Sequence, residues 1–309
     1  MKWSVDPGDP LGVNLADIGL EGAPAADRTP AEPADFEPPQ VVEGLPFAGY
    51  NSDLGSVSAS GLRLLARSPL HHWHALRRPD REPEPPTDAQ VFGTAIHCAV
   101  LEPDAFELRF AARPPMDRRT KEGKAAYADF MESIGDRTEL KSDQWHGALA
   151  VAASVRETEM GRILLAGGRS EVSVYWTDRA TGIRCRMRPD FVPSSQPVLV
   201  DLKSCENASD TAFSAQAWRL GYHVTAAFYV DGWRAATGEK RDYVFAAWEK
   251  EPPYASAWYY ADDQLLEAGR CEYERLLRIY ARCLAADEWP GYPAILQPLF
   301  PPAWAMDKS

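Results

Sequence analysis

The chain has 309 residues, a formal net charge of −12 at pH 7 and 45% hydrophobic residues. Its length suffices for one large domain or two small ones, and no segment approaches the roughly 18–20 apolar residues of a membrane span. The start, MKWSVDPGDP, lacks the basic and apolar stretches of a secretion signal. The five cysteines lack paired C-x-x-C spacing, which predicts reduced thiols in a cytoplasmic protein rather than disulfides or a cysteine metal site.

Residues 1–48 are predicted to form an acidic, proline-rich tail that is extended or disordered, ahead of a single domain over residues 49–309. The tail holds nine acids, two bases and eight prolines, so its net charge is −7. The remaining 36 acids and 31 bases give −5. Much of the negative charge is therefore expected to lie outside the domain.

Four helices are predicted in the first half of the domain. They cover residues 60–76 with Ser58 or Ser60 as the cap, 88–101, 120–134 and 142–159. In the second of these, Gly93 and Ala95 are small enough to allow close approach to a sheet, and His97 lies beside apolar neighbours.

Alternating and β-branched runs then predict strands. Residues 169–177 and 183–187 flank the turn-forming run 178–182, which indicates a hairpin. After the loop 193–197, residues 198–204 (VLVDLKS) form another strand. Side chains alternate along it, so Asp201 and Lys203 share one face.

Pro189 has no N–H group and is expected to end its strand just before Asp190. Asp190 can therefore hang at the end of the sheet, facing Asp201 and Lys203. Such a group of two carboxylates and one ammonium suits a Mg²⁺-dependent phosphodiesterase. The alternative is an exposed cross-strand ion pair, although the apolar run before Asp201 favours a buried strand, where a charged pair is costly.

Further along, residues 208–235 predict a long helix broken near Gly221, residues 242–259 predict strands around a turn at Pro252-Pro253, and residues 262–285 predict a final helix. The fold class expected from this order is α/β, with a central mixed β-sheet flanked by helices.

An ordered set of short motifs runs through the chain. It comprises Ser58 and Ser60, Ser68-Pro69, Gly93-Thr94-Ala95-Ile96-His97, Leu101-Glu102-Pro103, Pro189-Asp190, Asp201-Leu202-Lys203, Gly221-Tyr222-His223, Ala227-Phe228-Tyr229, Trp289-Pro290 and Pro302-Ala303-Trp304. This set resembles the RecE-type exonucleases, the nuclease domain of exodeoxyribonuclease VIII, within the PD-(D/E)XK superfamily. The resemblance covers about residues 56–305 and implies a restriction-endonuclease-like core.

The resemblance also implies roles for individual residues. His97, Asp190 and Asp201 correspond to metal ligands, the backbone carbonyl of Leu202 joins them, and Lys203 corresponds to the catalytic lysine. The implied cofactor is Mg²⁺, and an imidazole ligand also makes the site suitable for Mn²⁺. The alternative is that His97 is an ordinary core or surface histidine of a helix, without a role as a metal ligand.

One position departs from the family pattern. Relatives carry a glutamine four residues before a tyrosine, whereas here Thr225 precedes Tyr229 at that spacing. Threonine keeps a hydroxyl but lacks the amide, and Gln216 is too distant in register to replace it. Thr225 and Tyr229 are candidate contacts to DNA or phosphate.

Arginines supply candidate phosphate contacts. Arg184, Arg186 and Arg188 alternate along one strand and share a face, with an ordinary solvated strand face as the alternative. Ser60 and Arg63 lie in a second basic region. In lambda-like enzymes an N-terminal region with Arg and Ser helps to hold the 5′ phosphate, so the resemblance implies this role for Ser60 and Arg63. Glu171 is a further candidate acid, more simply explained as a charge at a strand end.

The resemblance implies a metal-dependent deoxyribonuclease that degrades linear double-stranded DNA from its ends, in the 5′→3′ direction, in RecE-type or phage-type recombination. It also implies a homo-oligomeric ring and a single-strand annealing protein as a partner. The alternatives are a RecB-like endonuclease, a nuclease specific for single strands, and a non-catalytic nuclease-like module that binds DNA or a partner protein.

Overall fold

The structure, a computed structural model, describes residues 37–81 and 85–301. Its centre is a five-stranded mixed sheet with the order β11-β10-β9-β8-β5. The strands are β5 (Gly168–Ser170), β8 (Phe191–Pro193), β9 (Val198–Cys205), β10 (Asp242–Glu249) and β11 (Ser256–Tyr260). β9 and β10 run parallel, and the other neighbours are antiparallel. The predicted α/β class, with a central mixed sheet between helices, is confirmed.

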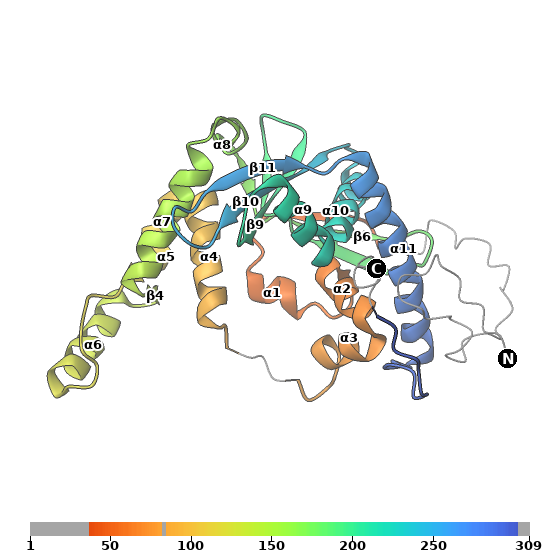
Figure 1. The fold of residues 1–309 in the computed structure, drawn as a ribbon, viewed down its shortest axis with the longest axis horizontal. Coiled ribbons are helices and arrows are strands. Elements are labelled where there is room, and N and C mark those ends of the chain that lie inside the picture. Colours follow the sequence, from red (N-terminus) through yellow and green to blue (C-terminus); the bar gives the residue numbers. More distant parts are fainter. Residues whose placement is uncertain (1–36, 82–84, 302–309) are drawn as a thin grey trace, which may run out of the picture.

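Helices cover both faces of this sheet (Figure 1). On one face, α4 (Asp88–Leu101) and α7 (Ser142–Arg156) pack against Val200 and Leu202 of β9. On the other face, α10 (Tyr222–Thr237) and α11 (Asp263–Ala286) pack in the same core as Leu199. Successive residues of β9 therefore serve opposite cores, as the alternation of a strand requires.

A second sheet of four strands has the order β1-β6-β7-β2. Its members are β1 (Gln40–Val42), β2 (Val57–Ser58), β6 (Ser173–Thr177) and β7 (Arg184–Met187). The predicted hairpin is confirmed, because β6 and β7 pair antiparallel around a turn in which the Asp178 carboxylate accepts from Thr181. The predicted strand 169–177, however, is two strands in two sheets. Glu171 separates them with a left-handed φ of 49°, which redirects the chain.

The predicted helix 60–76 is also wrong in its length. It is two helices, α2 (Ala59–Arg67) and α3 (Pro69–Leu76), with Ser58 capping the first. Ser68 is extended between them, and its hydroxyl accepts the N–H of His71. Proline is favoured at the first position of a helix and restricts the residue before it, so Ser68-Pro69 both ends one helix and begins the next.

The predicted break near Gly221 is confirmed. α9 (Asp210–Arg219) ends before it, and Gly221 has a φ of 69° at the start of α10. α10 and α11 approach very closely at Gly269, where an added Cβ would meet the backbone oxygen of His223 at 2.0 Å. Only glycine permits this contact.

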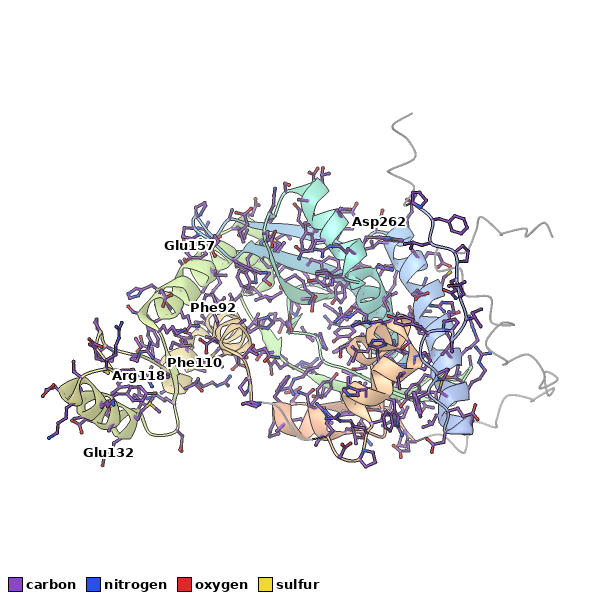
Figure 2. All side chains as sticks on the ribbon, turned by 60° about the horizontal axis from the view of Figure 1, so that its bottom comes forward. Phe92, Phe110, Arg118, Glu132, Glu157 and Asp262 are labelled. Carbon is purple, nitrogen blue, oxygen red and sulfur yellow. The ribbon has the colours of Figure 1, made fainter. Side chains whose placement is uncertain are left out.

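The remaining elements extend to one side of the sheet (Figure 1), with Arg118 and Glu132 near the end of the extension (Figure 2). They are α5 (Pro103–Arg109), β3 (Phe110–Ala112), α6 (Lys121–Ile134) and β4 (Thr138–Leu140), whereas α8 (Glu159–Leu164) follows α7 near the central sheet. β3 and β4 pair in parallel. Among residues 37–81 and 85–301, none of the helices has the length and hydropathy to cross a membrane.

Residues 1–36 of the predicted tail lie outside the described residues. The part that is described does not form a separate tail. Residues 40–42 form β1, which pairs with β6, and α1 (Phe47–Ser52) begins where the tail was expected to end. In the view of Figure 1, α1 lies between α4 and α2.

Candidate active site

The predicted acid after Pro189 lies beside the part of β9 that β8 leaves unpaired, which we name the open edge of β9. β8 pairs with β9 through Phe191 and Val200, whereas β9 continues to Cys205. Beyond the pair, the Asp190 carboxylate takes the place of a neighbouring strand, because its Oδ2 accepts the Leu202 N–H at 2.7 Å. The Asp190 carbonyl in turn accepts the Glu171 N–H at 2.9 Å. Both its side chain and its backbone are therefore fixed.

His97 reaches the same edge from α4. Its Nδ1 lies 3.7 Å from Asp190 Oδ1, and its side chain is 29% exposed. This separation is too long for a hydrogen bond. It does match two ligands of one divalent ion, which lie about 3–4 Å apart when each bond is close to 2.1 Å.

Asp201 and Lys203 are in contact on one face of β9, as the alternation of the strand predicts. Asp201 is only 4% exposed. Burial alone would lower the pKa of Lys203, but the carboxylates of Asp201 and Asp190 outweigh burial and raise the pKa above its ordinary value. Lys203 is therefore an ammonium at neutral pH, and its Nζ lies 5.2 Å from the centre of the Tyr222 ring.

The two carboxylates influence each other. Burial raises the pKa of Asp190 to about 6, and Asp201 adds to the rise, while His97 and Lys203 oppose it. His97 and Lys203 therefore do not fully compensate the negative charge of an ionised Asp190 beside Asp201. A bound cation would relieve that excess.

Within the described part of the chain, no three His, Cys, Asp or Glu side chains are grouped closely enough to form a complete metal centre. The donor chemistry nevertheless fits a hard or borderline divalent ion, and the His97–Asp190 pair has a suitable spacing. Leu202 adds a further donor. The N–H and C=O groups of one strand residue point to the same side, so the Leu202 carbonyl faces the edge that Asp190 occupies.

The structure also brings together two predicted DNA-contacting residues from distant segments. Arg63 of α2 donates from Nη1 to the Thr225 hydroxyl of α10 at 3.3 Å. Ser60 contacts the Ser58 hydroxyl at 3.0 Å.

The Tyr229 hydroxyl donates to the Arg188 carbonyl at 3.4 Å. Burial raises the pKa of Tyr229, and Asp201 and Asp190 are among the groups that add to the rise.

The three alternating arginines of the second sheet have different surroundings. Arg186 is buried and donates to the carbonyls of Asp53 and Ser56. Arg184 and Arg188 also contact carbonyl oxygens of the chain's own N-terminal segment. The Glu171 carboxylate accepts from Arg188 at 2.8 Å, so its side chain holds an arginine rather than facing the metal ligands.

Sequence reasoning did not find several residues around the site. Tyr50 of α1 is 7% exposed and lies over the guanidinium groups of Arg186 and Arg188. Tyr243 of β10 is fully buried, and its pKa is raised by burial and by Asp201. An aromatic residue at a helix or strand position is an ordinary core pattern, so the sequence alone gave no signal for either tyrosine.

Gln216 has a position that its sequence spacing did not indicate. Its amide donates to the Ser204 carbonyl at 2.9 Å, one residue beyond Lys203. It thereby steadies the end of β9 from α9, on the side of the sheet that carries Lys203.

Comparisons with known proteins agree with this architecture. Residues 58–295 match the family described as "PDDEXK-like domain of unknown function (DUF3799)", which covers most of the chain. The chain belongs to this family, and the predicted PD-(D/E)XK core is thereby confirmed. A search of curated proteins gives no match.

Among solved structures, the chain is similar to a crystal structure of a protein named "Putative exonuclease" from Eubacterium rectale. The TM-score is 0.56 at 16% sequence identity, and the match covers 86% of this chain and 98% of the other. At this identity the likeness establishes the shared fold. The candidate site of this chain therefore lies in a fold that the two proteins share.

Proposed function

We propose that the protein is a metal-dependent deoxyribonuclease that degrades linear double-stranded DNA from its ends. The observation that carries this proposal is the meeting of His97, Asp190 and the Asp201–Lys203 pair around the open edge of β9. Membership of a PDDEXK-like family supports a nuclease, and the name of the Eubacterium rectale protein supports exonuclease action.

The residues divide the work as follows. His97 and Asp190 would hold a divalent ion, Mg²⁺ or Mn²⁺, with Asp201 and the Leu202 carbonyl as further donors. When bound, the ion supplies an activated water at neutral pH and offsets charge on the phosphate. Lys203 is already protonated, so it acts as a donor that orients a water or phosphate oxygen and stabilises the negative charge that develops.

The Arg63–Thr225 contact supports a role for this surface in holding the DNA backbone. Arginine is always charged, and its guanidinium suits phosphate oxygens. Thr225 fixes the direction of the Arg63 side chain through its hydroxyl. Ser60 lies on the same helix, α2, one turn before Arg63. Tyr229 is half-buried, and its hydroxyl donates to the carbonyl of Arg188, two residues before Asp190.

The finer parts of the proposal come from the resemblance to RecE-type enzymes. They are 5′→3′ polarity, a homo-oligomeric ring around the duplex, and cooperation with a single-strand annealing protein in recombination. The proposed cytoplasmic location rests instead on the unpaired spacing of the cysteines. A ring would keep the enzyme on one DNA end through many cuts, because dissociation would require the duplex to be released from the centre.

The test is a digestion assay with three matched DNA substrates. Linear duplex with a 5′ phosphate, covalently closed circular duplex and single-stranded DNA are each incubated with Mg²⁺, Mn²⁺ or EDTA. Digestion of the linear duplex alone, abolished by EDTA, is expected. Cutting of the closed circle would instead identify a RecB-like endonuclease, and cutting of only the single strand would identify a single-strand nuclease.

A non-catalytic module that binds DNA or a partner protein is the second candidate. It is favoured by the lack of a complete three-residue metal centre in the described part of the chain. Thr225, in place of the glutamine of relatives, points the same way. Binding of linear duplex without digestion under any of the metal conditions would support this candidate over the enzyme.

A further inference from the structure

Three arginines near the site are held by an acidic segment of the same chain. We name Arg169, Arg184 and Arg188 the arginine row, and residues 37–52 the strap. Arg184 donates to the Glu37 and Pro38 carbonyls at 3.1 Å each and pairs with the Glu37 carboxylate at 3.4 Å.

The other two members of the row contact the strap in the same way. Arg169 pairs with the Glu43 carboxylate at 2.8 Å. Arg188 donates to the Leu45 carbonyl at 2.9 Å. The strap thus presents carboxylate and carbonyl oxygens to guanidinium groups, which is the chemistry that phosphate oxygens would offer.

The row leads to the proposed reaction centre. Arg188 precedes Asp190 by two residues, and the Tyr229 hydroxyl donates to its carbonyl. Arg184 lies two alternations earlier along the same stretch, about 13 Å away when the backbone is extended. A nucleic-acid strand that passes the carboxylates could therefore continue along the row.

The strap and the Glu171 carboxylate, which accepts from Arg188 at 2.8 Å, together satisfy Arg188 only in part. The Arg188 side chain is 11% exposed, and its Nε and Nη1 groups are buried without a hydrogen-bond partner. Buried donors without acceptors are costly, and a phosphate has oxygens enough to accept from several of them at once. The row therefore has binding capacity that its present occupant does not use.

The strap is lightly held compared with the rest of the fold. β1 has three residues, and α1 has no side-chain cap. Val41 and Phe47 are 40% and 66% exposed, and the Glu37 and Glu43 side chains are 75% and 62% exposed. Tyr50 is its one buried residue. Ion pairs with such exposed partners contribute little to stability, so replacing them with phosphate contacts costs little.

We infer that the arginine row binds backbone phosphates of the DNA substrate and that the strap is a competing occupant which restrains binding until duplex displaces it. This inference rests on the proposed function. Arg186 is not part of the row, because the carbonyls of Asp53 and Ser56 that it holds lead directly into β2 of the second sheet.

The test compares two double variants of the full chain with equal charge changes. Glu37→Gln/Glu43→Gln removes the strap carboxylates, and Asp129→Asn/Glu132→Gln removes two exposed acids of α6. Binding of fluorescent 5′-phosphorylated duplex is measured in EDTA by anisotropy, so that cleavage does not enter. The strap variant is expected to bind about fivefold more tightly than the wild type and the α6 variant about equally to the wild type.

Two further measurements separate the strap from a general effect of charge. Adding Arg184→Gln to the strap variant is expected to reverse most of the gain. Hydrogen exchange of residues 40–52 in the wild type is expected to rise when duplex is added, because the strap leaves the row. A strap variant that binds no better than the α6 variant, or exchange unchanged by duplex, would overturn the inference.

The outcomes also separate the inference from the proposed function. If wild type digests linear duplex while the two double variants bind it equally, the enzyme assignment stands and the strap has only a structural role. If none of the proteins binds duplex, both the arginine row as a phosphate site and the proposed function are rejected.

Discussion

The carboxylate centre beside β9 and the arginine row, which lies in β5, in β7 and just after β7, are both concentrations of charge, but their charges are balanced differently. At the centre, the half-buried Asp190 has a pKa raised to about 6, and its imidazole neighbour is beyond hydrogen-bond distance. At the row, each guanidinium has a carboxylate or carbonyl from its own chain.

The difference indicates which charges await a ligand. A buried charge without a partner lowers the stability of the fold, so its presence indicates a site where a ligand of opposite charge binds. The centre retains it at Asp190, which supports a cation site. The row is compensated, which by itself would suggest a structural role, except that Arg188 still has two buried donors without partners.

The largest expected effect is the loss of catalysis in Lys203→Ala. Removing the ammonium that stabilises developing charge is expected to lower the rate of duplex digestion about a thousandfold. The same change leaves buried Asp201 without its cation and is expected to destabilise the fold by about 3 kcal/mol.

A paired variant separates these two effects. Asp201→Asn/Lys203→Met removes both charges, so most of the lost stability should return in denaturant unfolding while activity stays absent. Digestion at the wild-type rate by Lys203→Ala would contradict the role given to this residue.

Replacement of arginines in the second sheet should separate structural from exchangeable contacts. Arg186→Ala leaves the buried region around the Asp53 and Ser56 carbonyls without a donor and is expected to cost about 3 kcal/mol. Arg184→Ala loses contacts to a largely exposed partner and should change stability by about 0.5 kcal/mol or less. Urea unfolding of the two variants measures the difference, and equal losses would remove the distinction between Arg186 and the row.

Asp190→Asn tests whether the ionised carboxylate of Asp190 lowers the stability of the fold. The folded-state pKa of Asp190 is raised from 3.8 to about 6, so the folded protein favours the protonated acid. Its ionisation therefore lowers stability progressively as pH rises from about 4 to above 6. In EDTA at pH 8 the asparagine variant is expected to be about 2 kcal/mol more stable than the wild type, yet inactive.

Thermal unfolding at pH 4 and pH 8 provides the comparison. The two proteins should differ least at the lower pH, where the wild-type acid is protonated in the folded state and partly protonated in the unfolded state. A variant less stable than the wild type at pH 8 in EDTA would show that the Asp190 carboxylate is stabilised by its surroundings.

The smallest expected effect is that of Arg63→Ala on DNA binding. Loss of one phosphate contact should weaken binding about equally for all sequences and reduce the slope of log affinity against log salt by about 0.9. Thr225→Val removes the hydroxyl that orients Arg63 and should give a weaker effect in the same direction. An unchanged salt slope in Arg63→Ala would place this arginine outside the DNA-binding surface.

Much of the fold was predictable because local signals agreed with it. The helix Asp88–Leu101 begins after Thr87, which caps it together with Gln90, and its predicted bounds are confirmed. The switch at Glu171 was not predictable, since a glutamate with positive φ has no sequence signature. The break at Ser68-Pro69 was not predicted, although the sequence carries a signal for it, because proline at the first position of a helix commonly follows a capping serine.

The site was predictable to the extent that it depends on strand alternation and on the family resemblance. Alternation placed Asp201 beside Lys203, and Pro189 indicated where Asp190 leaves its strand. The surroundings of Arg186 and the burial of Tyr50 depend on residues 37–56 folding back over β7, a tertiary contact that no local pattern indicates.

Calorimetric titration of Mn²⁺ into the wild type and into Asp190→Ala tests the central claim most directly, because it reports the ion without requiring catalysis. Binding to the wild type, lost in Asp190→Ala and in His97→Ala but kept in Glu132→Gln, is the predicted result. Equal binding by the wild type and all three variants, or no binding by the wild type, would contradict a divalent ion at the edge of β9.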